Sequence, residues 1–264
     1  MIFNFTKFIK KVDFIVYIRS ALLLLLLFPG QAFAIVNAED MTLLVDEEGL
    51  AGKVALSANG DRGNVTTNGA EISSLLRLNH GKYTEILALN YKYSQSRGVR
   101  NANKSYLHLR HRYHLNEAWA LEGFGQTQQD EFANLKVRAL LGAGVRWSQK
   151  RDVWHFHLGV GSFYEYEKLR KSASNAKLHF WRASTYMATD YLLSEQVKLH
   201  ETVYFQPVWS DMADFRVLND TALKVSLTEH LALSLTLEVT YDSRPPVGTV
   251  KGNVSYKTGV EYHF

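Results

Sequence analysis

Histidine and arginine side chains recur at every second position in parts of the sequence, a spacing that places them on one face of a β-strand. One such row contains His108, Arg110, Arg112 and His114. A cationic row of this kind is chemically suited to binding phosphate or carboxylate groups. It could equally neutralise acidic side chains on neighbouring strands, and the sequence leaves both alternatives open.

A second row raises the question of metal binding. His155 and His157 lie two positions apart, and Glu165 and Glu167 end the same segment. Two imidazoles and a carboxylate can bind zinc. However, a strand rises about 3.3 Å per residue, so the glutamates would lie roughly 25 Å from the histidines. A third ligand would have to come from a neighbouring strand, such as His179. We therefore predict no metal site.

No catalytic residues are predicted either. Cysteine is absent, which excludes a thiolate metal site and a cysteine nucleophile. None of the ten histidines is followed two positions later by serine, as barrel-type outer-membrane phospholipases would require. The acids that a barrel protease could use, Asp130 with Glu131 and Asp211 with Asp214, qualify by composition only. We expect no cofactor, and a lipid-modifying enzyme or protease is the least favoured function.

These side chains belong to segments with a period of two, the period of a β-strand. In the last segment, from Val250 to Phe264, aromatic and β-branched residues alternate with polar residues and glycine. A soluble strand usually alternates for about five or six residues, a third of this length. Spanning a bilayer takes about 9–11 tilted residues. Apolar residues on the outside and charged residues on the inside are the pattern of a membrane barrel.

Turn-forming residues divide the chain into about twelve such segments. Tight polar turns are predicted near residues 79–81, 116–117, 149–151, 194–195 and 228–230. Longer breaks span residues 61–68, 94–103, 127–134, 168–176, 210–214 and 242–249. An even strand count with short turns on one side is typical of bacterial outer-membrane barrels. We predict an all-β fold, a transmembrane antiparallel up-and-down β-barrel. The mean hydropathy of -0.18 excludes a polytopic helical membrane protein.

Two features do not follow the alternation. Glu85 and Glu201 fall on the predicted lipid face, and the segment from Lys177 to Tyr191 alternates poorly. A β-bulge or an error of register could explain either feature, and the sequence does not choose between them.

The predicted lumen face is rich in basic side chains. The basic residues assigned to it are Arg110, Arg112, Lys136, Arg138, Arg146, Lys198, Arg216, Lys224, Lys251 and Lys257, together with Lys53, Arg77 and Lys92. Seven acids share this face: Glu71, Glu122, Glu165, Glu167, Asp220, Glu238 and Glu261. In a twelve-strand barrel such side chains would narrow the bore. We predict a narrow pore with an anion bias. The alternative is a structural envelope protein with a closed, salt-bridged lumen.

The first 34 residues have the three parts of a secretory signal. Basic residues lead into the apolar run Ala21–Phe28, and the small-residue motif Ala32-Phe33-Ala34 follows. We predict cleavage after Ala34, a periplasmic lead-in over residues 35–51, and the barrel over residues 52–264. The signal contains four basic residues and one acid, so it carries most of the net charge of +4. We expect no nucleic-acid partner, because the basic residues of the barrel alternate into a lumen instead of forming an exposed patch.

The carboxyl terminus resembles the β-signal that outer-membrane barrels present to their assembly machinery. Its residues are Tyr256, Val260, Tyr262 and Phe264. We expect the barrel-assembly machinery and periplasmic chaperones as partners, and the outer membrane of a Gram-negative bacterium as the location. Outer-membrane lipids and lipopolysaccharide are further expected partners, since the basic segment 168–171 suits phosphate groups.

Three glycine-spaced stretches resemble a known protein family. They are residues 57–67, residues 130–144 with Leu141-Gly142-Ala143-Gly144, and Leu158-Gly159-Val160-Gly161. Over about residues 52–264 the chain is similar to the domain-of-unknown-function family 481, whose members are labelled salt-induced outer-membrane proteins. The resemblance implies an outer-membrane barrel, no assigned catalytic role, and production under osmotic stress.

Overall fold

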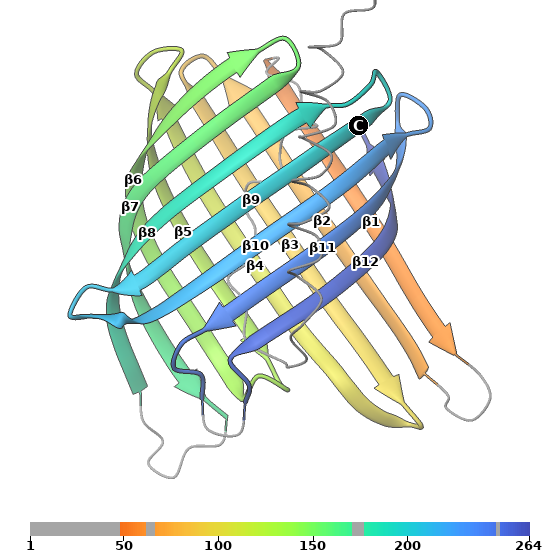
Figure 1. Cartoon of the computed structure of the whole chain (residues 1–264), viewed down its shortest axis with the longest axis vertical. Helices are drawn as coiled ribbons and strands as arrows, with labels where there is room; N and C mark the ends of the chain where they lie inside the picture. Colours follow the sequence, from red (N-terminus) through yellow and green to blue (C-terminus); the bar gives the residue numbers. More distant parts are fainter. Residues whose placement is uncertain (1–47, 62–66, 171–176, 247–248) are drawn as a thin grey trace, which may run out of the picture.

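Twelve antiparallel strands form a closed barrel (Figure 1) in which each strand pairs with the next and β12 pairs with β1. The computed structural model describes residues 48–61, 67–170, 177–246 and 249–264. The strands are β1 (Gly49–Asp61), β2 (Thr67–His80), β3 (Tyr83–Ser96), β4 (Val99–His114), β5 (Trp119–Asp130), β6 (Leu135–Arg151), β7 (Trp154–Leu169), β8 (Lys177–Leu192), β9 (Val197–Val208), β10 (Asp211–Ser226), β11 (Leu231–Asp242) and β12 (Gly252–His263).

The predicted all-β barrel of twelve strands is confirmed. The strands are 12 to 17 residues long, enough to cross a bilayer at a tilt. No helix in the described part of the chain is long and apolar enough to span a membrane. The predicted signal peptide and residues 35–47 of the predicted lead-in lie outside the described residues, whereas residues 49–51 begin strand β1.

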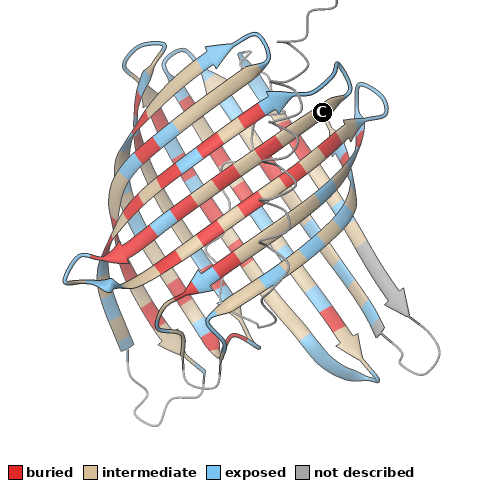
Figure 2. Ribbon diagram, in the orientation of Figure 1, coloured by how far each residue is buried: buried red, intermediate tan, exposed pale blue. Residues whose placement is uncertain are grey.

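Burial is inverted relative to a soluble protein. Large apolar side chains face outward, as in Leu141, 72% exposed, and Val160, 57% exposed. Charged side chains of the same strands, such as Arg138 and Glu165, are buried inside. Figure 2 shows this as buried and more exposed residues alternating along strands such as β8, β9 and β10. An apolar outer surface around a polar interior suits a bilayer.

The short turns lie close to the predicted positions, but two of the predicted long loops are tight turns. Strands β3 and β4 are joined by Arg97 and Gly98 alone, and β9 and β10 by residues 209–210. Arg97 and Gly98 both have positive φ, 50° and 75°, as a two-residue type I′ hairpin requires. The polar residues read as a loop over 94–103 therefore continue the two strands.

Strand β8, where the sequence alternates poorly, is regularly paired with β7 along its length. Its even-numbered positions up to Asp190 face inward: Phe180 is half-buried on the same face as the buried Arg182, whereas His179 and Trp181 are exposed. The two acids on the outer face have polar partners there. Glu85 contacts His111 at 2.7 Å, and Glu201 accepts a hydrogen bond from Thr221 at 2.5 Å.

The barrel closes where β1 meets β12. Gly52 and Phe264 exchange two backbone hydrogen bonds, with N···O distances of 2.9 and 3.0 Å. Cross-strand pairing continues on β1 from Lys53 to Leu56 and, among the described residues, goes no further. In Figure 1 the loop-side ends of β1 (orange) and β12 (dark blue) lie apart. The other neighbouring strands are paired along most of their length.

Candidate functional site: the barrel lumen

An ion-pair network centred on Arg216 fills part of the loop-side half of the lumen. The Arg216 guanidinium lies 2.7 Å from Glu165, 3.2 Å from Glu167 and 2.9 Å from Asp242. Arg138 donates to the same Glu167 oxygen from Nε and Nη2, at 2.9 and 2.7 Å. All five side chains are buried. The network therefore links β6, β7, β10 and β11 across the inner surface.

Arg182 of β8 extends this network and is only 1% exposed. Its guanidinium lies 3.3 Å from Glu165 and 3.0 Å from Asp214, and it donates to the Gln206 carbonyl oxygen at 3.2 Å. Arg182 does not stand out in the sequence, because its strand alternates through alanine, serine and threonine. Treating those residues as neutral would have placed Arg182 on the same inner face as Ser184.

A second cluster surrounds Glu122 nearer the short turns. Its carboxylate lies 2.5 Å from Arg112, 3.6 Å from Arg110 and 3.9 Å from Arg146. The Tyr186 hydroxyl donates to the second Glu122 oxygen at 2.7 Å and accepts from Arg146 at 2.9 Å. Four side chains from three strands thus share the one buried carboxylate of Glu122.

A third cluster lies at the short-turn end beside the β1–β12 junction. Glu261 is within 3.6 Å of Lys53, 3.8 Å of Lys224 and 3.4 Å of His263. Lys198 lies opposite Lys224 in the β9–β10 register and is half-buried. Charge is thus concentrated where β1 begins and where β10 and β12 finish.

The buried pair His200 and Asp190 was not selected from the sequence. His200 Nδ1 lies 2.9 Å from the Asp190 carboxylate, and its Nε2 lies 2.8 Å from the Thr202 hydroxyl. Both residues face inward at alternate positions, so the period-two pattern could have identified them. Asp190, His200 and Thr202 thus form a buried hydrogen-bonded chain.

The buried charges are distributed unequally along the barrel axis. Toward the short turns, five buried basic residues form what we call the basic band: Lys53, Arg110, Arg112, Arg146 and Lys224. In the described residues the buried acids at that level are Glu122, Asp190 and Glu261, and a fourth, Asp220, lies near the middle of β10. The loop-side network instead matches three buried arginines with three buried acids: Glu165, Glu167 and Asp242. The excess of basic side chains is therefore confined to one end.

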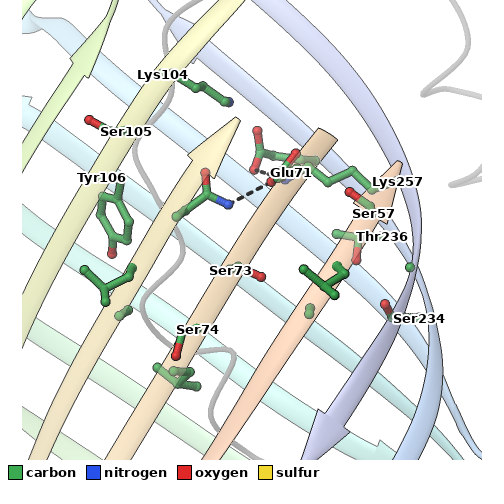
Figure 3. Close-up of a pocket in the computed structure, with 18 of the residues that line it drawn as sticks. Ser57, Glu71, Ser73, Ser74, Lys104, Ser105, Tyr106, Ser234, Thr236 and Lys257 are labelled. Carbon is green, nitrogen blue, oxygen red and sulfur yellow. Dashed lines mark hydrogen bonds and ion pairs between the residues drawn. The ribbon is translucent and has the colours of Figure 1, made fainter. Parts of the chain in front are cut away.

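The cavities are also unequal. A small cavity of ≈ 30 Å³ lies between the Arg216 network and the Glu122 cluster. A larger one, of ≈ 210 Å³, lies against β1–β4, β11 and β12 (Figure 3). Its wall carries hydroxyl groups, including Ser57, Ser73 and Thr236, beside Lys257 and Glu71, which are 3.1 Å apart. The lumen is thus closely packed on one side and open on the β1–β12 side.

The structure brings most of the predicted lumen residues together, with two exceptions. Buried in the lumen are Arg110, Arg112, Arg138, Arg146, Arg216 and Lys224; half-buried are Lys198 and Lys257. Lys136 is exposed, because the β6–β7 register shifts between Leu135 and Val137 and leaves Lys136 outside the alternation. Lys251 precedes β12 and is also exposed. Lys136 and Lys251 are therefore not among the buried side chains of the lumen.

The four residues of the predicted assembly signal share the outer face of β12 and its end. Tyr256 is 83% exposed, whereas Val260, Tyr262 and Phe264 are 47–51% exposed. These side chains point toward the lipid, so none of them contributes to the lumen.

The histidines considered for metal binding do not converge. His157 Nδ1 contacts the Ser148 hydroxyl at 2.9 Å, whereas His179 is exposed on the outer face and contacts the Tyr164 hydroxyl. In the described ranges no group of three histidine, aspartate or glutamate residues has the arrangement of a metal site.

The acids considered for a protease have structural contacts instead. Asp130 accepts hydrogen bonds from the backbone of residues 132 and 133, at 3.1 and 3.0 Å. Asp211 pairs with Arg244 at 2.6 Å, and Glu131 pairs with Arg100 at 2.6 Å. These contacts order the loop ends.

Two of the glycine-spaced motifs, residues 141–144 and 158–161, form a bare strip on the inner wall of β6 and β7, whereas residues 62–66 of the stretch 57–67 lie outside the described residues. Gly144 and Gly161 lie opposite each other in the register. A methyl group at Gly144 would lie 2.7 Å from the Val160 carbonyl oxygen, and one at Gly159 would overlap the Tyr186 ring. The absence of side chains lets Tyr186 reach across this wall to Glu122. The motifs thus shape the lumen and carry no reactive group.

Comparison with known proteins agrees with the architecture. The sequence model of the family described as "Protein of unknown function, DUF481" matches residues 54–264. No curated protein matches the chain by sequence.

Several solved structures share the fold. The COG4313 outer membrane channel from Pseudomonas putida F1 has a TM-score of 0.54 at 13% identity, over 87% of this chain and 100% of that chain. The NanC porin has a TM-score of 0.50 at 11% identity, over 80% and 98%. The translocator domain of the autotransporter NalP from Neisseria meningitidis has 0.50 at 13%, over 84% and 91%. At such identities the likeness concerns the fold, that of outer-membrane barrels.

Proposed function

This chain belongs to the DUF481 family of proteins of unknown function, and from that premise we propose that it is a narrow pore of the outer membrane for small polar solutes. The observation that carries the proposal is the ≈ 210 Å³ cavity with hydroxyl and charged walls on the β1–β12 side. Closely packed ion pairs occupy the other side of the lumen. The solute path therefore follows β1–β3, β11 and β12.

The anion bias is the second part of the proposal and is supported by the basic band. Rings of basic side chains favour anions at a constriction. The band lies at the short-turn end, which faces the periplasm in bacterial barrels. The larger cavity has a different composition, with Lys53, Lys104 and Lys257 against five acids. The basic band, not the cavity, would thus set the selectivity.

Single-channel recording in planar bilayers tests both parts. We expect small, discrete conductance steps and a reversal potential of the anion-selective sign in a KCl gradient. Arg112→Gln together with Arg146→Gln should reduce the selectivity about two- to fivefold, because it removes two of the five charges of the basic band. Lys136→Gln with Lys251→Gln is the matched control, since both lysines are exposed. Folded protein without channel events, or with cation selectivity, would overturn the proposal.

A structural envelope protein with a closed lumen is the second candidate. The Arg216 network favours it, because one buried guanidinium contacts three acids on two strands. A deletion strain distinguishes the candidates: reduced uptake of small solutes supports the pore, whereas leakiness and detergent sensitivity support the structural role.

Location and partners complete the proposal. The apolar outer surface and the exposed carboxyl-terminal aromatic residues suit insertion into the outer membrane by the barrel-assembly machinery after periplasmic chaperones. The basic residues near position 170 suit lipopolysaccharide phosphates. We propose no catalytic activity.

A further inference from the structure

The junction between β1 and β12 is incomplete on the loop side. Pairing joins Lys53–Leu56 of β1 to residues 260–263 of β12, and in the described part of the chain it stops there. Beyond that point β1 continues to Asp61 and pairs only with β2, while β12 begins at Gly252 and pairs only with β11. Two strand edges therefore face each other without a shared hydrogen-bond ladder.

Open strand edges are unusual in a membrane barrel. Backbone N–H and C=O groups that face hydrocarbon without a partner are strongly unfavourable, which is why membrane barrels close. Polar groups must therefore meet these edges from the lumen or from a ligand. The loop side of a bacterial barrel faces the outer leaflet, so the open part of the junction lies at that leaflet.

The larger cavity lies directly behind the opening. Figure 3 shows Ser57 of β1, Lys257 of β12 and Thr236 of β11 around it, with Glu71 of β2 beside Lys257 and with Ser105 and Tyr106 of β4 on the opposite side. Both strands that border the opening thus contribute to the cavity wall. A ligand in the cavity could reach the membrane without passing through either end of the barrel.

The cavity suits a hydroxylated, uncharged group. Hydroxyl and amide groups can both donate to and accept from sugar hydroxyls, and carboxylates accept from them, as Glu71 already accepts from Asn90 at 2.8 Å. Tyr106 adds an aromatic surface. Five acids and three lysines line the cavity, a balance that disfavours a phosphate-bearing headgroup.

The outer surface beside the opening suits acyl chains. Leu56 is 61% exposed, and Tyr256 is 83% exposed, the largest value among the exposed large apolar side chains of the described residues. Tyr256 lies in the part of β12 that has no β1 neighbour. An apolar outer surface thus lies directly beside the opening of the polar cavity.

We propose that the β1–β12 junction is a lateral opening to the outer leaflet, and that the cavity behind it binds the sugar headgroup of a glycolipid. The acyl chains remain in the bilayer against Leu56 and Tyr256. This inference does not require that the lumen conduct ions. A locked junction should abolish glycolipid binding and leave any axial conductance in place, so the two proposals can fail separately.

A disulfide can lock the junction, because the chain contains no cysteine. A Cβ atom at Gly259 would lie 3.9 Å from the Ser57 Cβ, within the range of about 3.5–4.5 Å for a disulfide. Ser57→Cys with Gly259→Cys therefore joins the strands just beyond their last pair. Thr127→Cys with Ala139→Cys, at facing positions of β5 and β6, which are paired along most of their length, is the matched control.

The probe is a diglycosyl diacylglycerol with a diazirine near the headgroup, in vesicles that contain the folded barrel. After photolysis, mass spectrometry maps the adducts. We expect adducts at lumen residues Ser73 and Ser234 in the wild type and the oxidised control. In the oxidised Ser57→Cys/Gly259→Cys variant the yield of these adducts should fall at least about tenfold, and reduction of the disulfide should restore it.

Four results would overturn the proposal. The lateral opening would be excluded if the wild type showed no lumen adducts. It would also be excluded if the locked variant kept them. Equal lumen labelling by phosphatidylcholine with the same diazirine would exclude selection of a sugar headgroup. Disulfide-linked dimers of the Ser57→Cys/Gly259→Cys variant would show that the open edges pair with a second copy of the chain instead.

Discussion

Tyr186 of β8 donates its hydroxyl hydrogen to Glu122 of β5 at 2.7 Å, across the inner wall formed by β6 and β7. The same hydroxyl oxygen accepts a hydrogen bond from Arg146 at 2.9 Å. The contact is possible because glycine occupies the wall between the two strands. A neutral phenol thereby orients a buried carboxylate among three arginines.

Removal of this hydroxyl should destabilise the barrel. In Tyr186→Phe, Glu122 and Arg146 each lose a buried hydrogen bond, and we expect a loss of about 1–3 kcal/mol in the free energy of unfolding. Urea unfolding in detergent micelles, followed by tryptophan fluorescence, measures it. Tyr256→Phe is the control, because that side chain is exposed on the outer surface, and it should change stability by less than about 0.5 kcal/mol. Equal effects of the two substitutions would contradict the assigned role.

The glycine strip makes a separate prediction. In Gly159→Ala the new methyl group overlaps the Tyr186 ring, and forced overpacking of this kind costs about 1–3 kcal/mol. Gly123→Ala on β5 is the control, because a methyl group there meets nothing within 4 Å. In unfolding measurements, Gly159→Ala should cost much less in a Tyr186→Ala background than in the wild type. A cost that is independent of Tyr186 would show that the backbone, not the ring, requires glycine.

Arg216 should be the most sensitive charged position of the lumen. Arg216→Met leaves Glu165, Glu167 and Asp242 buried with less compensation, and loss of one partner from a buried ion pair costs about 3–5 kcal/mol. Arg244→Met removes a guanidinium that is 55% exposed and pairs with Asp211, and it should cost at most about 1 kcal/mol. Unfolding midpoints and the heat-modifiable shift on electrophoresis measure the difference. Similar costs at both positions would mean that the network contributes little.

The period of two was sufficient to predict the strands and most of the lumen face. It works because a membrane barrel has opposite solvents on its two sides, so a side chain such as Arg138 or Leu141 reports its face directly. It failed where the alternation breaks: the register shift at Lys136, and the small residues around Arg182. The two-residue turn at Arg97 was read as a long loop, because its polar flanking residues also suit a strand end.

The pairing of the lumen charges could not be predicted in the same way. Arg216 and Glu165 are separated by fifty-one positions in the sequence, and their contact depends on which strands lie side by side around the closed barrel. Counting charges gave an excess of basic residues but not its position near the short turns. The incomplete β1–β12 junction depends on the register between the two strands. Register is a relation between strands, so neither strand's own sequence shows it.

The short pairing at this junction makes Phe264 important for closure. Its backbone exchanges hydrogen bonds with Gly52, and its ring lies where a Gly52 side chain would be, 2.6 Å from a built Cβ atom. Deletion of Phe264 removes both hydrogen bonds from a junction with only a few paired residues. We expect a loss of about 1–3 kcal/mol in the free energy of unfolding and a lower temperature for loss of the compact electrophoretic form.

Phe264→Ala retains the backbone bonds and should therefore refold in detergent with a smaller loss of stability. If the ring is part of the assembly signal, Phe264→Ala should still reduce insertion in cells. Refolding yields and outer-membrane levels, measured in parallel, separate closure of the barrel from recognition by the assembly machinery. Equal stability of the deletion variant and the wild type would exclude a role for Phe264 in closure.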